Sequence, residues 1–114
     1  MTLREQQSLF VRLVGVLIEW AYQQGYELTF GEAYRTPEQA ARNALTGVGT
    51  RNSLHVERLA IDLNLFVDGV FQHDSAAHKP LGDYWKSLHP LCRWGGDFAR
   101  PDGNHYSMTR GGRS

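Results

Sequence analysis

The apolar residues near the start of the chain recur every three or four positions. This spacing, which places them on one face of a helix, is seen for Phe10, Leu13, Val14, Leu17 and Ala21. Thr2 and Glu5 have the spacing of a capping box, and Gly25 can end the helix. The pattern therefore predicts an amphipathic helix over residues 3–24.

Two shorter helices are predicted further along the chain. Thr36, Pro37 and Gln39 form a second start signal, for a helix that runs to about Leu45 and ends at Gly47. A third helical repeat, which stops before Pro90, is formed by Leu81, Tyr84, Trp85 and Leu88. The segment 72–79, just before the third helix, is polar. We expect its histidines, His73 and His78, to be solvated rather than to bind a ligand.

Strand patterns alternate with these helices. Residues 26–34 are rich in strand formers, with Tyr26, Leu28 and Phe30 on one side, and would deliver Arg35 at their end. A second strand is predicted to face the core with Leu59, Ile61, Leu63 and Leu65, and to carry Asp62 on its other face. Asp68-Gly69 predicts a hairpin turn, residues 94–98 a bent strand, and residues 105–108 a last strand.

These elements predict a small α+β domain over residues 1–109, with an antiparallel sheet and helices packed on one side of it. Residues 46–52 are a loop by composition, and the Gly-rich residues 110–114 are expected to form a flexible tail. A chain of 114 residues with 41% hydrophobic content can bury the core that such a domain requires.

Charge and hydropathy narrow the function classes. Twelve basic and twelve acidic residues give a net charge of zero, so the chain lacks the basic footprint of a nucleic-acid binder. The apolar run 9–18 is broken by Arg12 and is too short to cross a bilayer, and no signal-peptide pattern follows it. We therefore expect a protein without a membrane partner that is cytoplasmic when synthesised.

The single cysteine, Cys92, excludes an internal disulfide and a thiolate-rich zinc site, and is expected to be a small buried apolar residue. Any metal site must then use His, Asp and Glu. We interpret His55, Asp62 and His105 as such a site, in a zinc cleft on the sheet, because two imidazoles and a carboxylate leave a fourth position open for water. Asp102 could serve as the general base, and Arg35 could face the oxyanion.

Ordinary interpretations of the same residues stay open on spacing alone. His55 could be a solvated loop residue, Asp62 a polar residue on the outer face of a strand, and Asp102 a turn former.

The order of these residues resembles a known family. Ser53-x-His55, Ala60-x-Asp62, Trp94-Gly95-Gly96 and Asp102-x-x-His105 are similar to motifs of the zinc peptidases of peptidoglycan, over residues 34–107. These are the VanY-like D-alanyl-D-alanine carboxypeptidases, the D-Ala-D-Ala dipeptidases and the phage L-alanyl-D-glutamate endolysins. The resemblance implies that His55, Asp62 and His105 bind Zn²⁺, that Asp102 is the acid or base, that Arg35 binds substrate or steadies the oxyanion, and that Ser53 bonds substrate or orients a loop.

Two positions depart from the family pattern. Arg58 stands where the motif usually has Gly, which suggests a different cleft wall or a changed specificity. Asp102 stands where the carboxypeptidases and dipeptidases use Glu and the phage endopeptidases use Asp. The second departure favours the endolysin type.

We therefore expect a monomeric zinc peptidase in which metal-bound water hydrolyses the peptidoglycan stem peptide between L-Ala and D-Glu, and which acts on the cell wall after release. A D-alanyl-D-alanine carboxypeptidase or dipeptidase is the alternative within the same chemistry. A ferrous oxygenase shares the ligand set, but its usual first pair is separated by one residue, whereas six separate His55 from Asp62. A non-catalytic module that binds the cell wall is the remaining alternative.

Overall fold

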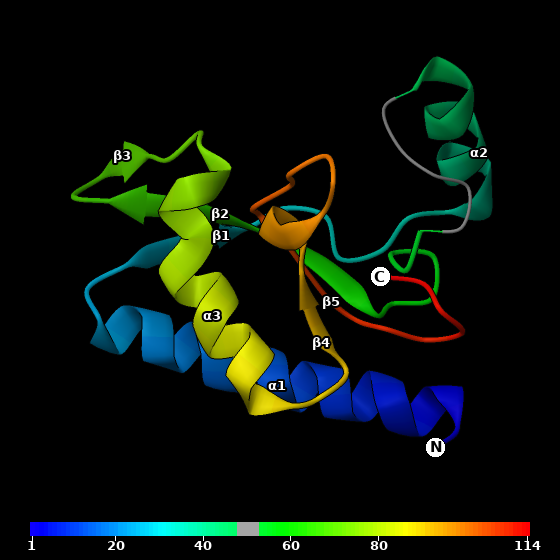
Figure 1. Ribbon diagram of the computed structural model, residues 1–114, viewed down its shortest axis with the longest axis horizontal. Helices are drawn as coiled ribbons and strands as arrows, with labels where there is room; N and C mark the ends of the chain where they lie inside the picture. The colour runs from blue at the N-terminus through cyan, green and yellow to red at the C-terminus, as the bar shows by residue number, and fades with distance from the viewer. Residues whose placement is uncertain (48–52) are drawn as a thin grey trace.

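A five-stranded antiparallel sheet forms the centre of the computed structural model, which describes residues 1–47 and 53–114 (Figure 1). Its main order is β1-β2-β5-β4, and β3 pairs with the end of β2. The strands are β1 (Glu27–Phe30), β2 (Ala60–Val67), β3 (Val70–Phe71), β4 (Cys92–Trp94) and β5 (His105–Met108). The helices are α1 (Leu3–Gln23), α2 (Pro37–Thr46) and α3 (Lys79–Leu88), with 3₁₀ helices η1 (Ser75–His78) and η2 (Gly95–Asp97).

The predicted helix boundaries are confirmed by their caps. The Thr2 hydroxyl accepts a hydrogen bond from the Glu5 amide at 3.1 Å, and the Glu5 carboxylate accepts one from the Thr2 amide at 2.9 Å. The Thr36 hydroxyl caps α2 by accepting from the Gln39 amide at 3.1 Å. Gly47 ends α2 with a φ of 78°, a left-handed conformation that suits glycine.

The hydrophobic core lies between the sheet and the pair α1 and α3, which pack against each other. The alternation predicted for β2 is confirmed, since Leu63 and Leu65 are fully buried and Ile61 is 6% exposed. Phe10 of α1 meets Trp85 of α3 edge to face, with ring centroids 5.7 Å apart. Figure 1 shows α2 standing apart from this layer, so α1 and α3 are the helices that pack on the sheet.

The first strand is shorter than predicted. β1 ends at Phe30. The Phe30 side chain is 71% exposed, because this edge strand contacts the core through Tyr26 and Leu28 instead. Beyond it the chain stays beside β2 in an irregular course: the Gly31 amide donates to Asp62 O, and the Asp62 amide donates to Glu32 O, both at 2.8 Å. This course brings residues 32–35 next to the metal-site candidates.

The predicted bent strand over 94–98 is also wrong in part. The strand ends at Trp94, and the next residues form η2. A side chain at Gly95 would place its Cβ 2.0 Å from Asp102 O, so the chain turns here against the segment that carries Asp102. The loop predicted over 46–52 begins where α2 ends, and residues 48–52 lie outside the described residues.

His78, expected to be solvated, is instead 3% exposed. Its Nδ1 lies 2.8 Å from the hydroxyl of Tyr106, which comes from β5, far away in the sequence. Burial lowers the pKa of His78 to about 4. Cys92 is buried as predicted, and burial raises the pKa of its thiol to about 12.

Residues 110–114 fold into a turn closed by a bridge between Arg110 and Arg113. The Arg113 guanidinium pairs with the Glu57 carboxylate at 2.6 Å. The flexibility expected of this segment stays a prediction. None of the described helices combines the length and the apolar character needed to cross a membrane.

Candidate metal centre

The three candidate ligands come from two strands and one turn. Asp62 on β2 and His105 on β5 are direct partners in the antiparallel register. His55 lies in the tight turn before β2, where its carbonyl accepts from the Arg58 amide and the Leu59 amide donates to Leu54 O. Long-range pairing and a local turn therefore bring together residues that are far apart in the sequence.

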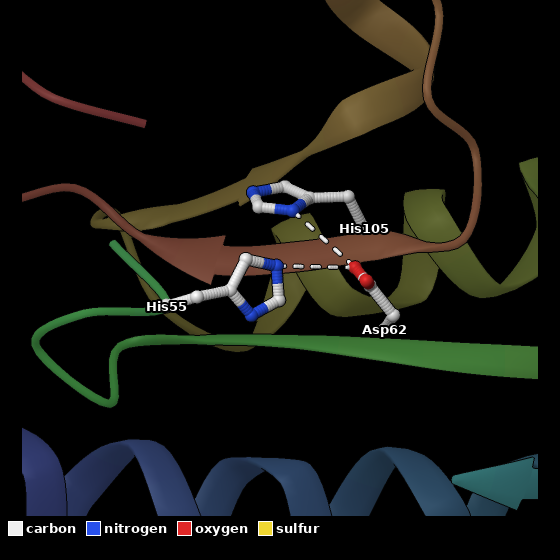
Figure 2. A group of neighbouring side chains, drawn as sticks. All are labelled: His55, Asp62 and His105. Carbon is white, nitrogen blue, oxygen red and sulfur yellow. Dashed lines mark ion pairs between the residues drawn. The ribbon is translucent and has the colours of Figure 1, made fainter. Parts of the chain in front are cut away.

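Their side chains point at one another. Oδ1 of Asp62 lies 3.2 Å from Nε2 of His55 and 3.6 Å from Nδ1 of His105, and the three potential ligand atoms all lie within 4.8 Å of one another. Figure 2 shows both imidazoles turned toward the Asp62 carboxylate. Both histidines are buried and Asp62 is half-buried, so the group is enclosed but reachable from one side.

This group has the donors that a zinc ion requires. Two imidazole nitrogens and one carboxylate oxygen form a three-ligand set that leaves a fourth position open. Oδ1 of Asp62 is buried and has no hydrogen-bond partner among the described residues, as expected of an atom reserved for a cation. Burial raises the pKa of Asp62, but the attraction of the neighbouring His105 and His55 rings outweighs burial and lowers it to about 2.

In each histidine, the ring nitrogen that is turned away from Asp62 lies near another polar group. Nε2 of His105 lies 3.2 Å from the Ser114 carbonyl oxygen, and donation to that oxygen leaves Nδ1 free to bind a metal. Nδ1 of His55 lies 3.8 Å from the Glu32 carboxylate, which leaves Nε2 on the side of Asp62. The contact with Ser114 orients His105, whereas Nδ1 of His55 has no hydrogen-bond partner among the described residues.

A cleft of about 760 Å³ contains this group together with Arg35, Ser53 and Asp102. Nε of Arg35 donates to the Glu32 carboxylate at 2.5 Å, and the Arg35 amide donates to His55 O at 3.2 Å. Ser53 accepts a hydrogen bond from the His55 amide at 3.2 Å, so it orients the turn that carries this ligand. The structure thus brings every residue of the predicted site into one cleft.

The turn that carries Asp102 is held from two sides at Gly103. The Gly103 amide donates to the Ser75 hydroxyl at 2.9 Å, and Nε1 of Trp94 donates to Gly103 O at 2.7 Å. A Cβ at Gly103 would lie 2.5 Å from the Cα of Ser75. These contacts fix the position of Asp102 on the rim of the cleft.

Arg58 does not form a cleft wall, contrary to one of the expectations from its sequence position. Its side chain is exposed and lies over the ring of Tyr34, with the guanidinium carbon 3.9 Å from the ring centroid. Its φ is 56°, in the left-handed region that favours glycine. The left-handed backbone at position 58 therefore explains why the motif usually has Gly there.

Several residues of the cleft were not predicted from the sequence. Glu32 contacts both Arg35 and His55, and its three-residue spacing from Arg35 is a signal that could have indicated it. Phe98, Arg100 and Arg113 also line the cleft. Their part in it depends on the η2 turn and on the fold of the last residues, which have no local sequence signature.

An α+β sheet that presents two histidines and an aspartate beside a second carboxylate and an arginine has the type of site used by metal-dependent hydrolases. A peptidase family model described as D-alanyl-D-alanine carboxypeptidase matches residues 46–108, more than half of the chain. The chain belongs to this peptidase family.

The fold is similar to the crystal structure of the L-Ala D-Glu endopeptidase ChiX of Serratia marcescens, with a TM-score of 0.75 and 18% sequence identity. The similarity covers 88% of this chain and 77% of that chain, and it confirms the α+β fold. No curated protein matches the chain.

Proposed function

We propose that this chain is a zinc-dependent peptidase that cleaves the stem peptide of peptidoglycan between L-Ala and D-Glu. The observation that carries the proposal is the meeting of His55, Asp62 and His105 in a cleft that also contains Asp102 and Arg35. Membership of the peptidase family and the fold shared with an L-Ala D-Glu endopeptidase support it.

His55, Asp62 and His105 would hold the zinc ion, which when bound activates water and polarises the scissile carbonyl. The exposed Asp102 carboxylate, which lines the same cleft, would take the proton of the attacking water and pass it to the leaving amine. Arg35, held by Glu32, supplies a permanent positive charge to the oxygen that becomes negative during attack.

The aspartate at position 102 supports the endopeptidase specificity, because the phage endopeptidases that the chain resembles use Asp there. The description of the matching family instead favours a D-alanyl-D-alanine carboxypeptidase. The two activities release different products, so the bond that is cut can be identified directly.

The test is digestion of purified peptidoglycan by the zinc-loaded protein, with dinitrophenyl labelling of new amino termini. The proposal expects labelled D-Glu, and expects the Asp102→Asn variant, matched in zinc content and fold, to release very little. Free D-Ala or D-Ala-D-Ala would support the alternative activity. Absence of any new amino terminus with a folded, zinc-loaded protein would overturn the peptidase proposal.

A further inference from the structure

A second hollow, of about 240 Å³, adjoins the cleft at the turn that carries Asp102. Pro101 and Asp102 line both hollows. Asp62 and Asn64 are alternate residues of β2 and so face the same side of the sheet, and the first lines the cleft while the second lines the hollow. An extended substrate that crosses this turn can therefore occupy the cleft and the hollow at once, with Asp102 beside the point where it crosses.

The two halves of this continuous surface differ in charge. The cleft is lined by three arginines, of which Arg35 pairs with Glu32 and Arg113 with Glu57. Arg100 has no ion-pair partner among the described residues, so it is the arginine that suits a ligand carboxylate. The hollow contains no arginine or lysine among the described residues, and its one carboxylate, Asp102, is shared with the cleft. The rest of its lining includes the amides Asn64, Gln72 and Asn104 and the rings of Phe71 and His73. It therefore suits a neutral ligand with many hydrogen-bonding groups.

The side chains of the hollow are held in place by local contacts. Nδ2 of Asn64 donates to the Thr29 hydroxyl at 3.2 Å, and Nε2 of Gln72 donates to Val70 O at 3.0 Å, which directs both amides. The rings of Phe71 and His73 meet edge to face, with centroids 4.6 Å apart, and Phe71 is 40% exposed. An accessible aromatic ring among fixed amides can pack on the C–H face of a sugar while the amides bond its polar groups.

We propose that this hollow binds the N-acetylmuramic acid sugar that precedes L-Ala in peptidoglycan. The inference rests on the proposed function, because it places the bond after L-Ala beside Asp102. The lactyl carboxyl of this sugar is consumed in the amide bond to L-Ala, so the attached sugar is neutral, whereas D-Glu on the other side of the bond carries a carboxylate. The absence of a cationic residue in the hollow and the presence of Arg100 in the cleft therefore orient the substrate, with the sugar in the hollow and D-Glu toward Arg100.

The volume fits this assignment. Pockets that enclose a whole drug-sized ligand measure about 300–1,000 Å³. A hollow of about 240 Å³ is smaller, which favours a single sugar unit over a stretch of glycan chain. Binding is thus expected to depend on the single sugar that carries the stem peptide.

The test compares two substrates of the zinc-loaded protein, N-acetylmuramyl-L-Ala-D-Glu-diaminopimelate and the same peptide with an N-acetyl group in place of the sugar. We expect kcat/KM to be about tenfold higher for the muramyl peptide, from packing of the sugar on Phe71 together with its hydrogen bonds to the amides. Phe71→Ala should remove most of this preference and leave cleavage of the sugar-free peptide unchanged. Val70→Ala, at an exposed neighbour on the same strand that does not line the hollow, is the matched control.

Equal kcat/KM for the two substrates, or an equal loss for both in Phe71→Ala, would overturn the sugar site while the peptidase proposal stands. If Phe71→Ala lost only the cleavage of the sugar-free peptide, the hollow would hold peptide and the sugar site would be overturned. If neither substrate is cleaved, the proposed function fails. Saturation-transfer NMR with N-acetylmuramyl-L-alanine amide, in which the lactyl carboxyl is an amide and the probe is neutral, then tests whether the hollow binds the sugar. A signal that Phe71→Ala abolishes and Val70→Ala retains supports the site, and no signal with the parent protein overturns it.

Discussion

Asp62 and His105 lie directly opposite each other in the register of β2 and β5, and the Asp62 carboxylate is 3.6 Å from Nδ1 of His105. Side chains of directly opposed residues share one face of an antiparallel pair. A shift of this pairing by one residue would turn one of the two side chains to the other face. The candidate metal centre therefore depends on the same strand register that buries Leu63 and Leu65 in the core.

Removal of a ligand is expected to abolish both metal binding and activity. His55→Ala and His105→Ala each leave two donors, too few to hold the ion, so metal content should fall from about one equivalent to background. Because the ion ties the turn at His55 to β2 and β5, its loss should also lower stability, by about 4 kcal/mol when free metal exceeds the dissociation constant a thousandfold. Elemental analysis and thermal unfolding with and without a chelator measure the two effects.

The matched control for these variants is His73→Ala, because His73 is exposed and outside the group. It should retain the metal and the melting temperature. Equal metal content in the parent protein and in His105→Ala would remove His105 from the site.

The local features of this fold could be predicted from the sequence because their causes are local. The capping residues of α1 and α2 and the alternation of β2 act within a few positions, and the structure confirms them. The pairing of β2 with β5 depends on residues more than forty positions apart, so spacing alone left the metal centre one of several interpretations. The family resemblance, rather than periodicity, selected the three ligands.

The errors have a similar physical origin. His78 lies among polar residues in the sequence and is buried because Tyr106 covers it from β5. The first strand was predicted over residues 26–34, but β1 ends at Phe30, which lies at the edge of the sheet and outside the core cluster. Burial depends on how the helices and the sheet pack together. The sequence of a single strand does not show which of its residues the other elements cover.

Replacement of Asp102 should separate chemistry from metal binding. The carboxylate lines the cleft but is not one of the three grouped ligands, so Asp102→Asn should retain the metal and the melting temperature. Loss of a general acid or base typically lowers the rate by about 10²–10⁴-fold. Steady-state cleavage of a stem peptide, with metal content measured on the same sample, is the check, and a variant with full activity would exclude Asp102 as the base.

The contacts at Gly103 should matter for turnover because they position Asp102. Gly103→Ala would force its Cβ to within 2.5 Å of the Cα of Ser75, so the turn must shift, and we expect kcat to fall by at least about tenfold. Ser75→Ala removes the hydrogen bond to the Gly103 amide without a clash, and should lower kcat more than it changes KM. Recovery of kcat in Ser75→Thr would indicate that the hydroxyl, rather than packing, is responsible.

Gly15→Ala is the glycine control for this comparison. Gly15 lies within α1 with no atom near its missing side chain, so alanine should stabilise the helix by about 0.5–1 kcal/mol and leave kcat unchanged. Equal kcat in Gly103→Ala and Gly15→Ala would contradict the positioning role.

Substitutions of Arg58 should follow its backbone conformation. A left-handed φ costs a residue with a side chain about 1–2 kcal/mol, and the contact with Tyr34 offsets about 0.5–1 kcal/mol of this at an exposed site. Arg58→Ala keeps the strain and loses the contact, so it should be the least stable variant, whereas Arg58→Gly should be close to the parent protein. Chemical unfolding measures the order, and unchanged kcat/KM in both variants would agree with the position of Arg58 outside the cleft.

The buried His78 should make stability fall between pH 6.5 and about 4. Its pKa is lowered from 6.5 to about 4 by burial, so in this window the unfolded chain binds a proton that the folded protein does not. Each pH unit of difference corresponds to about 1.4 kcal/mol, which gives an upper bound of about 3 kcal/mol lost toward pH 4. The lowered pKa of Asp62 acts in a separate pH range, below its ordinary value of 3.8, where protonation removes the stability that the charged carboxylate contributes.

The variant His78→Gln can still bond the Tyr106 hydroxyl but does not titrate, so its free energy of unfolding should change less with pH than that of the parent protein. Unfolding in denaturant at several pH values, with His73→Gln as the exposed control, measures this difference, and parallel pH curves for the parent protein and His78→Gln would show that His78 does not contribute.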